Sequence, residues 1–297
     1  MKIEEVAEAI YRLEVQLPGA RYIFSVYLID GNEGVLIEPG PASMVPAIRE
    51  GMKRLGIQRL SYIIPTHIHL DHGGGAGKLA ELFQHATVVL HPRAVKHVLN
   101  PSRLIEATRM VYGDNFESTY GPILPVPESQ VKVPADGELM RINERELQII
   151  HAPGHAPHQI AIFDKKTGGL FCGEALGVPI PGDESFALPS VSVQDFNPDL
   201  YLETIEKLKR LTPRMLFYSH DGGVRKPEKL ITSLVETTQS LRDTILEGLR
   251  NGETIESIRP RVRELMSGYA GKRAGAISSV EDMILGYTTY FNKKGLI

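Results

Sequence analysis

A histidine-rich turn that follows a buried strand constrains this fold more than any other part of the chain. The apolar run 60–65 is typical of a buried strand, and the glycines at 73–75 are typical of a turn into a helix. Between them stand His67, His69, Asp71 and His72. Imidazole and carboxylate groups held this close together need a positive charge among their lone pairs, and zinc, iron or manganese suits both kinds of ligand. The segment therefore predicts a metal site at the end of a strand.

The cluster offers more ligands than one catalytic ion uses. A tetrahedral catalytic zinc takes three protein ligands and keeps one position open. His67 and His69 alternate along the chain and can point toward one ion, while Asp71 and His72, at the start of the next turn, can point toward another. The alternative is a polar strand-end turn with solvated histidines.

Composition excludes several classes of protein. The 297 residues are 42% hydrophobic and 23% charged, as in ordinary globular proteins, and the net charge of −3 favours neither nucleic acid nor a membrane surface. The single cysteine, Cys172, excludes an intrachain disulfide and fits a reducing compartment. Acidic residues at the N-terminus do not fit a secretory signal, and no run approaches the roughly 20 apolar residues of a membrane span. We therefore expect a cytoplasmic protein with a small-molecule substrate.

The order of elements predicts an α/β fold. Short apolar strands with Gly/Asn turns come first, strands and helices then alternate, and the chain is helical from Pro227 to about Phe291 with breaks at Gly252 and at 268–275. Asn197 followed by Pro198 marks a helix start. This order suggests two mixed sheets between helices. We predict a domain over 1–225 and a helical C-terminal extension over 226–297, which could be a pocket wall, a homodimer contact or a cover for the sheet.

The segment near 101–130 differs from its surroundings. Prolines recur along it, with Tyr112, Phe116 and Tyr120 between them. A long irregular insertion in a compact domain is usually a functional lid or a surface loop. We therefore expect an irregular insertion here, serving either as a lid over the site or as a surface loop.

Three later positions repeat the pattern of a metal-binding side chain at a strand end. His155 lies in a rigid Pro/Gly turn, Glu174 ends the strand segment 170–174, and His220 follows the strand 215–219. Each residue alone would be weak evidence, because a lone polar residue at a strand end is more often a cap. Since strand ends on one edge of a sheet converge, we expect these side chains to join the first cluster.

With these motifs the chain resembles the metallo-β-lactamase-fold hydrolase superfamily, whose signature is His-x-His-x-Asp-His followed by separate His, acidic and His positions. The resemblance covers about residues 1–225 and implies a four-layer αβ/βα sandwich. It implies that His67, His69 and His155 hold one metal, that Asp71, His72 and His220 hold a second, and that Glu174 bridges both. Zinc is the favoured ion, with iron or manganese as alternatives. The family most often has aspartate where this chain has Glu174.

The resemblance implies hydrolysis by a hydroxide held between two metal ions, with Asp71 as both ligand and proton acceptor. A small ester, thioester or lactone is the expected substrate. The alternatives are a phosphodiesterase or ribonuclease of the same fold and an iron-dependent oxygenase resembling persulfide dioxygenases. His158 could line the pocket, assist proton transfer or cap its turn, and Cys172 is either a ligand or a small buried side chain. Tyr112 and Tyr218 are candidate hydrogen-bond donors to the substrate or packing residues.

Overall fold

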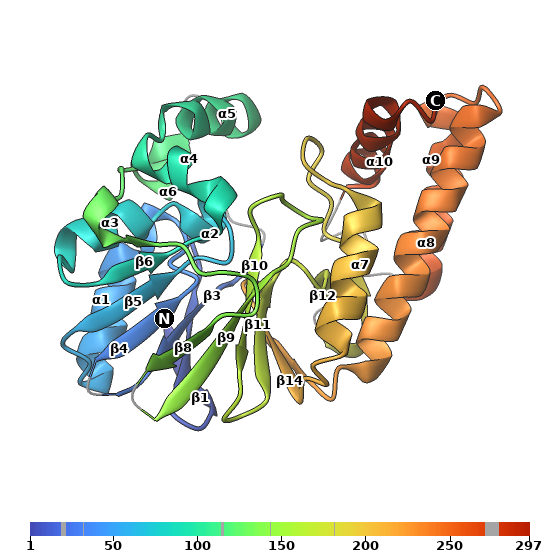
Figure 1. The fold of residues 1–297 in the computed structure, drawn as a ribbon. Helices are drawn as coiled ribbons and strands as arrows, with labels where there is room; N and C mark the ends of the chain where they lie inside the picture. Colours follow the sequence, from blue (N-terminus) through green and yellow to red (C-terminus); the bar gives the residue numbers. More distant parts are fainter. Residues whose placement is uncertain (19–21, 32, 114–115, 143, 181, 271–278) are drawn as a thin grey trace. The chain divides into compact units, whose positions relative to one another are not determined.

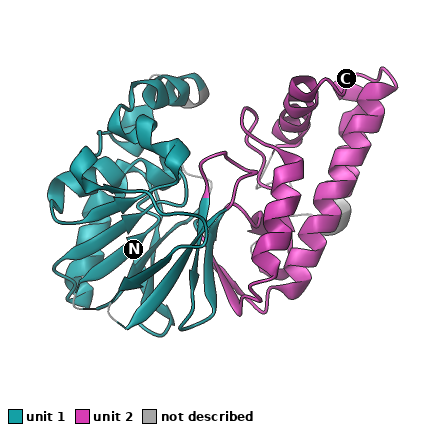
Figure 2. Ribbon diagram, in the orientation of Figure 1, with its two compact units in different colours: residues 1–151, 160–173, 219–222 teal, residues 152–159, 174–218, 223–297 magenta. Residues whose placement is uncertain are grey.

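A computed structural model describes residues 1–18, 22–31, 33–113, 116–142, 144–180, 182–270 and 279–297 (Figure 1). The chain forms two compact units, each made of several separate stretches of sequence (Figure 2). Unit 1 comprises residues 1–151, 160–173 and 219–222, and unit 2 comprises residues 152–159, 174–218 and 223–297. The division into domains at residue 225 stays a prediction.

The first sheet of unit 1 has seven strands in the order β1-β2-β3-β4-β5-β6-β7. Pairs from β1 to β4 are antiparallel, which agrees with the short strands and Gly/Asn turns predicted for the start of the chain, and pairs from β4 to β7 are parallel. The sequence did not predict β1, because its charged residues hide the apolar pattern. The strands are β1 Lys2–Ala7, β2 Ile10–Val15, β3 Phe24–Ile29, β4 Gly34–Ile37, β5 Leu60–Ile64, β6 Thr87–Val89 and β7 Val131–Lys132.

Helices and a second sheet cover the two faces of the first sheet. Ile48 of α1 and Leu79 of α3 share a buried cluster with Leu28 of β3. On the other side, the ring of Tyr27 meets Phe171 edge to face, with centroids 5.2 Å apart. Every residue of β3 is therefore buried. The helices are α1 Val45–Leu55 and α3 Ala76–Leu82, and the second sheet contributes the antiparallel strands β8 Leu139–Ile142, β9 Arg145–His151, β10 Ile160–Asp164 and β11 Gly169–Gly173.

The expectation of an irregular segment near 101–130 is wrong, because helices occupy much of it. The elements in this region are η2 Pro92–Ala94, α4 Val95–Leu99, α5 Ser102–Tyr112, α6 Phe116–Tyr120 and η3 Glu128–Gln130. Leu70, from the histidine-rich turn, forms a small buried cluster with Phe116 and Ile123. Burial and, after it, the negative charge of Asp71 raise the pKa of Tyr120. The segment thus packs on the predicted metal-binding turn.

The described residues of unit 2 form two hairpins and four helices. Asn197 caps α7 through its side chain, which accepts a hydrogen bond from the N–H of Leu200, as predicted. The predicted helical break at Gly252 is confirmed, since its φ is +74° between α8 and α9. The elements are β12 Val178–Ile180, β13 Asp183–Leu188, α7 Pro198–Lys209, β14 Met215–Tyr218, β15 Gly223–Arg225, α8 Glu228–Arg250, α9 Ile255–Ala270 and α10 Val280–Lys294.

The C-terminal helices take part in the core of unit 2. The helix α8 packs on β13 and on α7, α9 and α10. The buried hydroxyl of Tyr287 in α10 donates to the carbonyl oxygen of Thr238 in α8 at 3.1 Å, and the Tyr287 ring meets Phe196 edge to face. Tyr290 donates to the carboxylate of Asp199 in α7. These contacts place the C-terminal helices in the packed core of unit 2; their use as a pocket wall, a dimer contact or a cover for the sheet stays a prediction.

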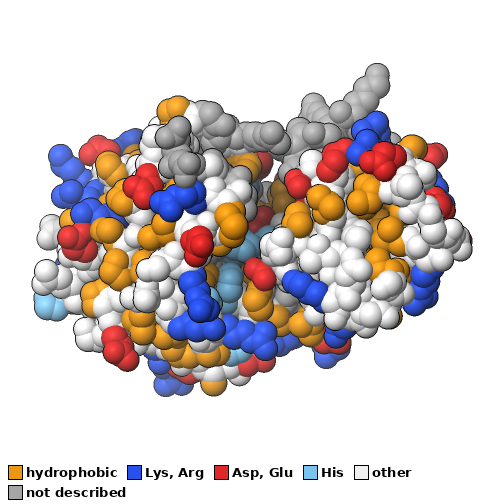
Figure 3. All heavy atoms as spheres, turned by 90° about the horizontal axis from the view of Figure 1, so that it is seen from above, with side chains coloured by type: hydrophobic (Ala, Val, Ile, Leu, Met, Phe, Trp, Pro, Cys, Tyr) orange, Lys and Arg blue, Asp and Glu red, His pale blue; other side chains and the backbone are white. Residues whose placement is uncertain are grey.

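The surface carries charges of both signs. In Figure 3, basic and acidic side chains are interspersed on the visible face, consistent with the small net charge of −3. Among the helices in the described ranges, none combines the length and the apolar character needed to cross a membrane.

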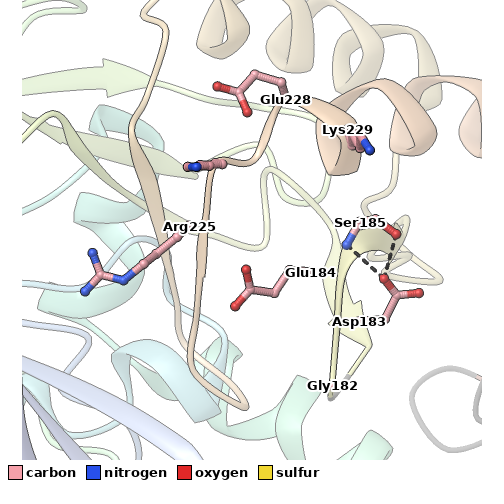
Figure 4. Close-up of a pocket in the computed structure, with 8 residues that line it drawn as sticks. Gly182, Asp183, Glu184, Ser185, Arg225, Glu228 and Lys229 are labelled. Atoms are coloured by element: carbon pink, nitrogen blue, oxygen red, sulfur yellow. Dashed lines mark hydrogen bonds between the residues drawn. The ribbon is translucent and has the colours of Figure 1, made fainter.

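An open pocket of about 500 Å³ lies in unit 2, where the β12–β13 hairpin, β15 and the start of α8 meet (Figure 4). Acidic and basic side chains mix around it, and Ser185 donates to Asp183 through both its N–H and its hydroxyl, at 2.8 and 2.7 Å. The lining residues are Gly182, Asp183, Glu184, Ser185, Arg225, Lys226, Glu228 and Lys229, which include none of the predicted metal ligands.

Candidate metal centre

The histidine-rich turn is packed closely against the chain that follows β4. The strand β5 ends at Ile64, and the short helix α2 spans Leu70–Gly73. The N–H of Gly75 donates to the carbonyl oxygen of Gly40 at 2.6 Å. The N–H of Gly40 in turn donates to the carbonyl oxygen of His72 at 2.9 Å. A Cβ on Gly75 would lie 3.0–3.2 Å from three carbonyl oxygens of residues 39–41. The glycine is therefore needed for close backbone packing around the histidines.

Asp71, His72 and His220 meet within unit 1. One candidate ligand atom from each lies within 4.8 Å of the others. The Oδ2 atom of Asp71 is 3.4 Å from Nε2 of His220 and 3.6 Å from Nε2 of His72. Ligand atoms at the usual 2.0–2.2 Å from one tetrahedral zinc lie about 3.3–3.6 Å apart. The spacing and chemistry of these three side chains therefore fit a divalent metal ion.

Pairing with β3 holds His220 in this position. An isolated bridge joins His220 to Phe24 at the start of β3, and the N–H of Ser25 donates to the carbonyl oxygen of Ser219 at 2.8 Å. Asp221, the next residue, has a φ of +55°, which a residue other than glycine rarely adopts. The strained turn directs His220 toward Asp71, although the two residues are far apart in sequence.

A buried carboxylate that the sequence did not reveal supports the group. Glu38 is 3% exposed and has a φ of +61°. Its Oε2 lies 3.0 Å from Nδ1 of His72, and its Oε1 accepts hydrogen bonds from the hydroxyls of Thr66, at 2.5 Å, and Ser219, at 2.9 Å. Because Nδ1 of His72 donates its N–H to Glu38, Nε2 keeps a free lone pair. This is the tautomer of histidine that can bind a metal through Nε2.

His67 and His69 stand together in the same unit. Nε2 of His67 lies 3.0 Å from Nδ1 of His69, and Nδ1 of His67 lies 3.2 Å from the hydroxyl oxygen of Thr66. His67 is 1% exposed. Two imidazole nitrogens at 3.0 Å require a proton or a cation close to them, so this pair too has the chemistry of a metal ligand set.

Unit 2 brings His155 and Glu174 together. Nε2 of His155 lies 2.8 Å from Oε2 of Glu174, and Nδ1 of His155 lies 3.1 Å from the carbonyl oxygen of Ser190, which accepts its proton. The hydroxyl of Ser190 donates to Oε1 of Glu174 at 2.9 Å. With Nδ1 as the donor, Nε2 and Oε2 both present lone pairs, and a proton or a metal ion must lie near both.

Gly154 makes this second arrangement possible. Its φ is +141°, and a Cβ there would overlap the backbone of Tyr201 in α7. Its carbonyl oxygen accepts a hydrogen bond from Asn197, and the Tyr201 hydroxyl donates to the carbonyl oxygen of Glu174 at 3.1 Å. The start of α7 therefore fixes the turn that carries His155.

The sequence also singled out four residues outside the proposed set of metal ligands. Cys172 is fully buried, and burial raises the pKa of its thiol well above the ordinary value, so a small buried side chain is its role. The hydroxyl of Tyr218 donates to the carbonyl oxygen of Leu176 at 2.8 Å, which makes it a packing residue. His158 is 9% exposed, and its three possible roles stay open. The side chain of Tyr112 lies outside the described residues.

Comparison with known proteins establishes the family. The model of the metallo-beta-lactamase superfamily matches residues 19–220, and this chain belongs to that superfamily. Human acyl-coenzyme A thioesterase MBLAC2 is 29% identical over 170 residues, which are 52% of this chain and 52% of that protein. Hydroxyacylglutathione hydrolase from Synechococcus sp. (strain JA-2-3B'a(2-13)) is 28% identical over 164 residues, 54% of this chain and 52% of that protein.

A solved structure agrees with the assignment of the fold. The metallo-beta-lactamase family protein TTHA1429 from Thermus thermophilus has a TM-score of 0.68 at 22% identity, with 97% of this chain and 94% of that chain covered. Family and structure together confirm the predicted αβ/βα fold class with a helical C-terminal segment. The chain spans about half, 52%, of the length of the two hydrolases it matches.

Proposed function

We propose that this chain is a metal-dependent hydrolase with two divalent ions that cleaves acyl thioesters. The observation that carries the proposal is the group formed by Asp71, His72 and His220, whose ligand atoms have the spacing of a tetrahedral ion. These three residues hold one ion, and the buried Glu38 orients His72 toward it.

As the sequence motif implies, His67, His69 and His155 would hold the second ion, and Glu174 would bind both. Two observations made within unit 2 support the roles of His155 and Glu174. Nδ1 of His155 is occupied by the carbonyl oxygen of Ser190, so that Nε2 is left for a metal. The hydroxyl of Ser190 holds one oxygen of Glu174 and leaves Oε2 beside that nitrogen. Zinc is the favoured ion, because imidazole and carboxylate suit it.

A pair of divalent ions would supply a nucleophile, since it lowers the pKa of bound water to about 7. The chain's residues then have separate roles. Asp71 binds through Oδ2, and its Oδ1 can accept the proton of the attacking water. The five histidines bind a metal as neutral imidazoles, so metal affinity depends on pH.

The relatives favour a thioester over a simple ester or a lactone. One of them is an acyl-coenzyme A thioesterase, and the other is a hydroxyacylglutathione hydrolase. Both names describe removal of an acyl group from a thiol. A thiolate is a good leaving group, so no residue has to protonate it strongly, and the predicted ligand set contains no dedicated general acid.

Metal analysis combined with a panel of substrates tests the proposal. Purified protein should contain two zinc or manganese ions per chain and should hydrolyse an acyl-coenzyme A or an acylglutathione faster than a lactone or a bis-aryl phosphate. His220→Ala should lose about one ion and the activity, whereas His85→Ala, on an exposed histidine, should keep both. One iron per chain would contradict the two-metal proposal, and faster cleavage of the phosphate would contradict the substrate class.

A further inference from the structure

The hydroxyl of Tyr22 donates a hydrogen bond to the carboxylate of Asp71, 49 residues further along the chain, with an O–O distance of 3.0 Å. The acceptor is Oδ2, the same atom that lies 3.4 Å from Nε2 of His220 and 3.6 Å from Nε2 of His72. Tyr22 therefore contacts the atom on which the three proposed ligands converge.

The ring of Tyr22 also packs against the site. Its centroid lies 4.0 Å from that of the His220 imidazole, and Phe24 meets the same imidazole edge to face at 5.5 Å. Backbone contacts fix this neighbourhood: Ile23 donates its N–H to Oδ1 of Asp221 at 3.1 Å, and the N–H of Asp221 donates to the carbonyl oxygen of Ile23 at 3.0 Å. The hydroxyl is thus held beside Asp71 by the contacts of Ile23 and Phe24, which follow Tyr22, with the turn at Asp221.

We propose that Tyr22 is a positioning residue for the ion held by Asp71, His72 and His220. Its hydroxyl fixes the rotation of the Asp71 carboxylate, and its ring fixes the plane of the His220 imidazole. Two of the three ligands are thereby held in place before an ion arrives, which lowers the entropy lost on binding. The inference rests on the proposed function only in that these three residues hold an ion, and it does not depend on the substrate.

The effect should appear in metal affinity. Loss of a partner that orients a ligand typically reduces metal affinity about 10–100-fold. In Tyr22→Phe the ring contacts with His220 and Phe24 remain, so the variant isolates the hydroxyl. Tyr11→Phe is a matched control, because Tyr11 lies opposite Leu28 at the far end of the β2–β3 hairpin. Tyr22 lies next to the near end, where Phe24 is opposite Val15.

Zinc titration of the metal-free, full-length chain against a coloured chelator measures each ion without substrate. Tyr22→Phe should bind one of the two ions about 10–100-fold more weakly and the other within about threefold of the wild type. Tyr11→Phe should match the wild type at both ions, and the metal-free proteins should unfold at the same temperature. Unchanged affinity for both ions in Tyr22→Phe would overturn the inference.

A double-mutant cycle with Asp71→Ala, which removes the acceptor, separates positioning from general damage. Because the hydroxyl acts through the carboxylate, Tyr22→Phe should cost less than about threefold in the Asp71→Ala background. An equal loss in both backgrounds would overturn the inference, and an Asp71→Ala protein that binds ions like the wild type would overturn the ligand assignment too. If the wild-type chain binds a single ion, that result contradicts only the two-metal proposal. The cycle then still tests whether Tyr22 affects the affinity for that ion.

Discussion

Glu38 holds His72 in the tautomer that can bind a metal, because its Oε2 lies 3.0 Å from Nδ1 of that histidine. Its other oxygen is occupied by the hydroxyls of Thr66 and Ser219. These donors come from two stretches of the chain. Thr66 and His72 follow β5, and Ser219 follows β14. One buried side chain thus links the histidine-rich turn to the segment that carries His220.

Glu38→Gln should weaken the ion bound by His72. The amide oxygen can still accept from Thr66 and Ser219, but the amide N–H then faces Nδ1 of His72 and drives the ring to the tautomer with a proton on Nε2. That proton blocks the lone pair needed for the metal, so we expect affinity for one ion to fall about 10–100-fold. Zinc titration of the metal-free protein measures the change.

Glu33→Gln is the control for Glu38→Gln, since the side chain of Glu33 is 46% exposed and forms a surface ion pair with Arg59 at 3.2 Å. It should leave zinc affinity unchanged. Glu38→Gln should unfold at nearly the wild-type temperature, because every buried group keeps a partner. Wild-type affinity in Glu38→Gln would show that His72 does not depend on this carboxylate, or that it is not a ligand.

Much of the fold and the ligands in contiguous segments could be predicted from the sequence. The strand that ends at Ile64 and the cluster after it are adjacent in the chain, so local patterns place His67, His69, Asp71 and His72 at one strand end. The start of α7 was equally readable, because Asn197 and Pro198 act through local geometry. Patterns that depend on neighbours in sequence are visible without a structure.

The supporting residues could not be predicted in this way. Glu38 lies 34 residues before His72 and Tyr22 lies 49 before Asp71, and both reach the site only through the pairing of distant strands. The helices α5 and α6 escape prediction for another reason: Pro101 and Pro122 lie just outside them and bound them, whereas recurring prolines are also typical of irregular chain.

Glu174→Ala should lower the metal content and thioester hydrolysis together. A bridging carboxylate contributes to both ions, so we expect affinity and rate to fall by more than the roughly 10–100-fold typical of an outer partner. Elemental analysis and an acyl-coenzyme A assay measure the two effects. The backbone carbonyl that accepts from Tyr201 is unchanged, so the local fold should persist. Glu184→Ala, on an exposed residue of the β12–β13 hairpin, should behave as the wild type; retention of both properties in Glu174→Ala would remove it from the ligand set.

Phe116→Ala should loosen the helices that pack on the metal-binding turn. Phe116 is 2% exposed and contacts Leu70 and Ile123, and truncation of a buried phenylalanine typically costs about 3–5 kcal/mol. Because this cluster is separate from the main core, the loss should appear as local opening. Amide hydrogen exchange should become faster in α5 and α6 and stay slow in β3. Met110→Ala, at a side chain 78% exposed on α5, should change nothing, and equal exchange in the two variants would contradict a packed insertion.

The buried His91 makes the stability of the fold sensitive to acid. Burial first, and then the nearby His151 and Arg93, lower the pKa of His91 to about 4, with Asp136 opposing the shift. The ring lies 4.4 Å from that of His151, and its Nδ1 accepts the N–H of Arg93 at 3.0 Å. An unfolded histidine has a pKa near about 6.5. Between about pH 6.5 and pH 4 the unfolded chain therefore binds a proton here that the folded chain does not, and stability falls as the pH falls.

His91→Asn should remove this dependence and keep the fold. Asparagine is a favoured N-cap, and its side-chain oxygen can accept the N–H of Arg93 as Nδ1 of His91 does. Urea unfolding at about pH 7 and about pH 4.5 should show that the wild type loses about 2–3 kcal/mol more than His91→Asn over this interval, from a shift of about 2.5 pKa units. Groups remote from His91 and loss of bound metal affect both proteins and cancel in the difference. His85→Asn, at an exposed histidine, should retain the wild-type pH dependence. Equal pH dependence in wild type and His91→Asn would mean that His91 takes up its proton as readily in the folded chain as in the unfolded one.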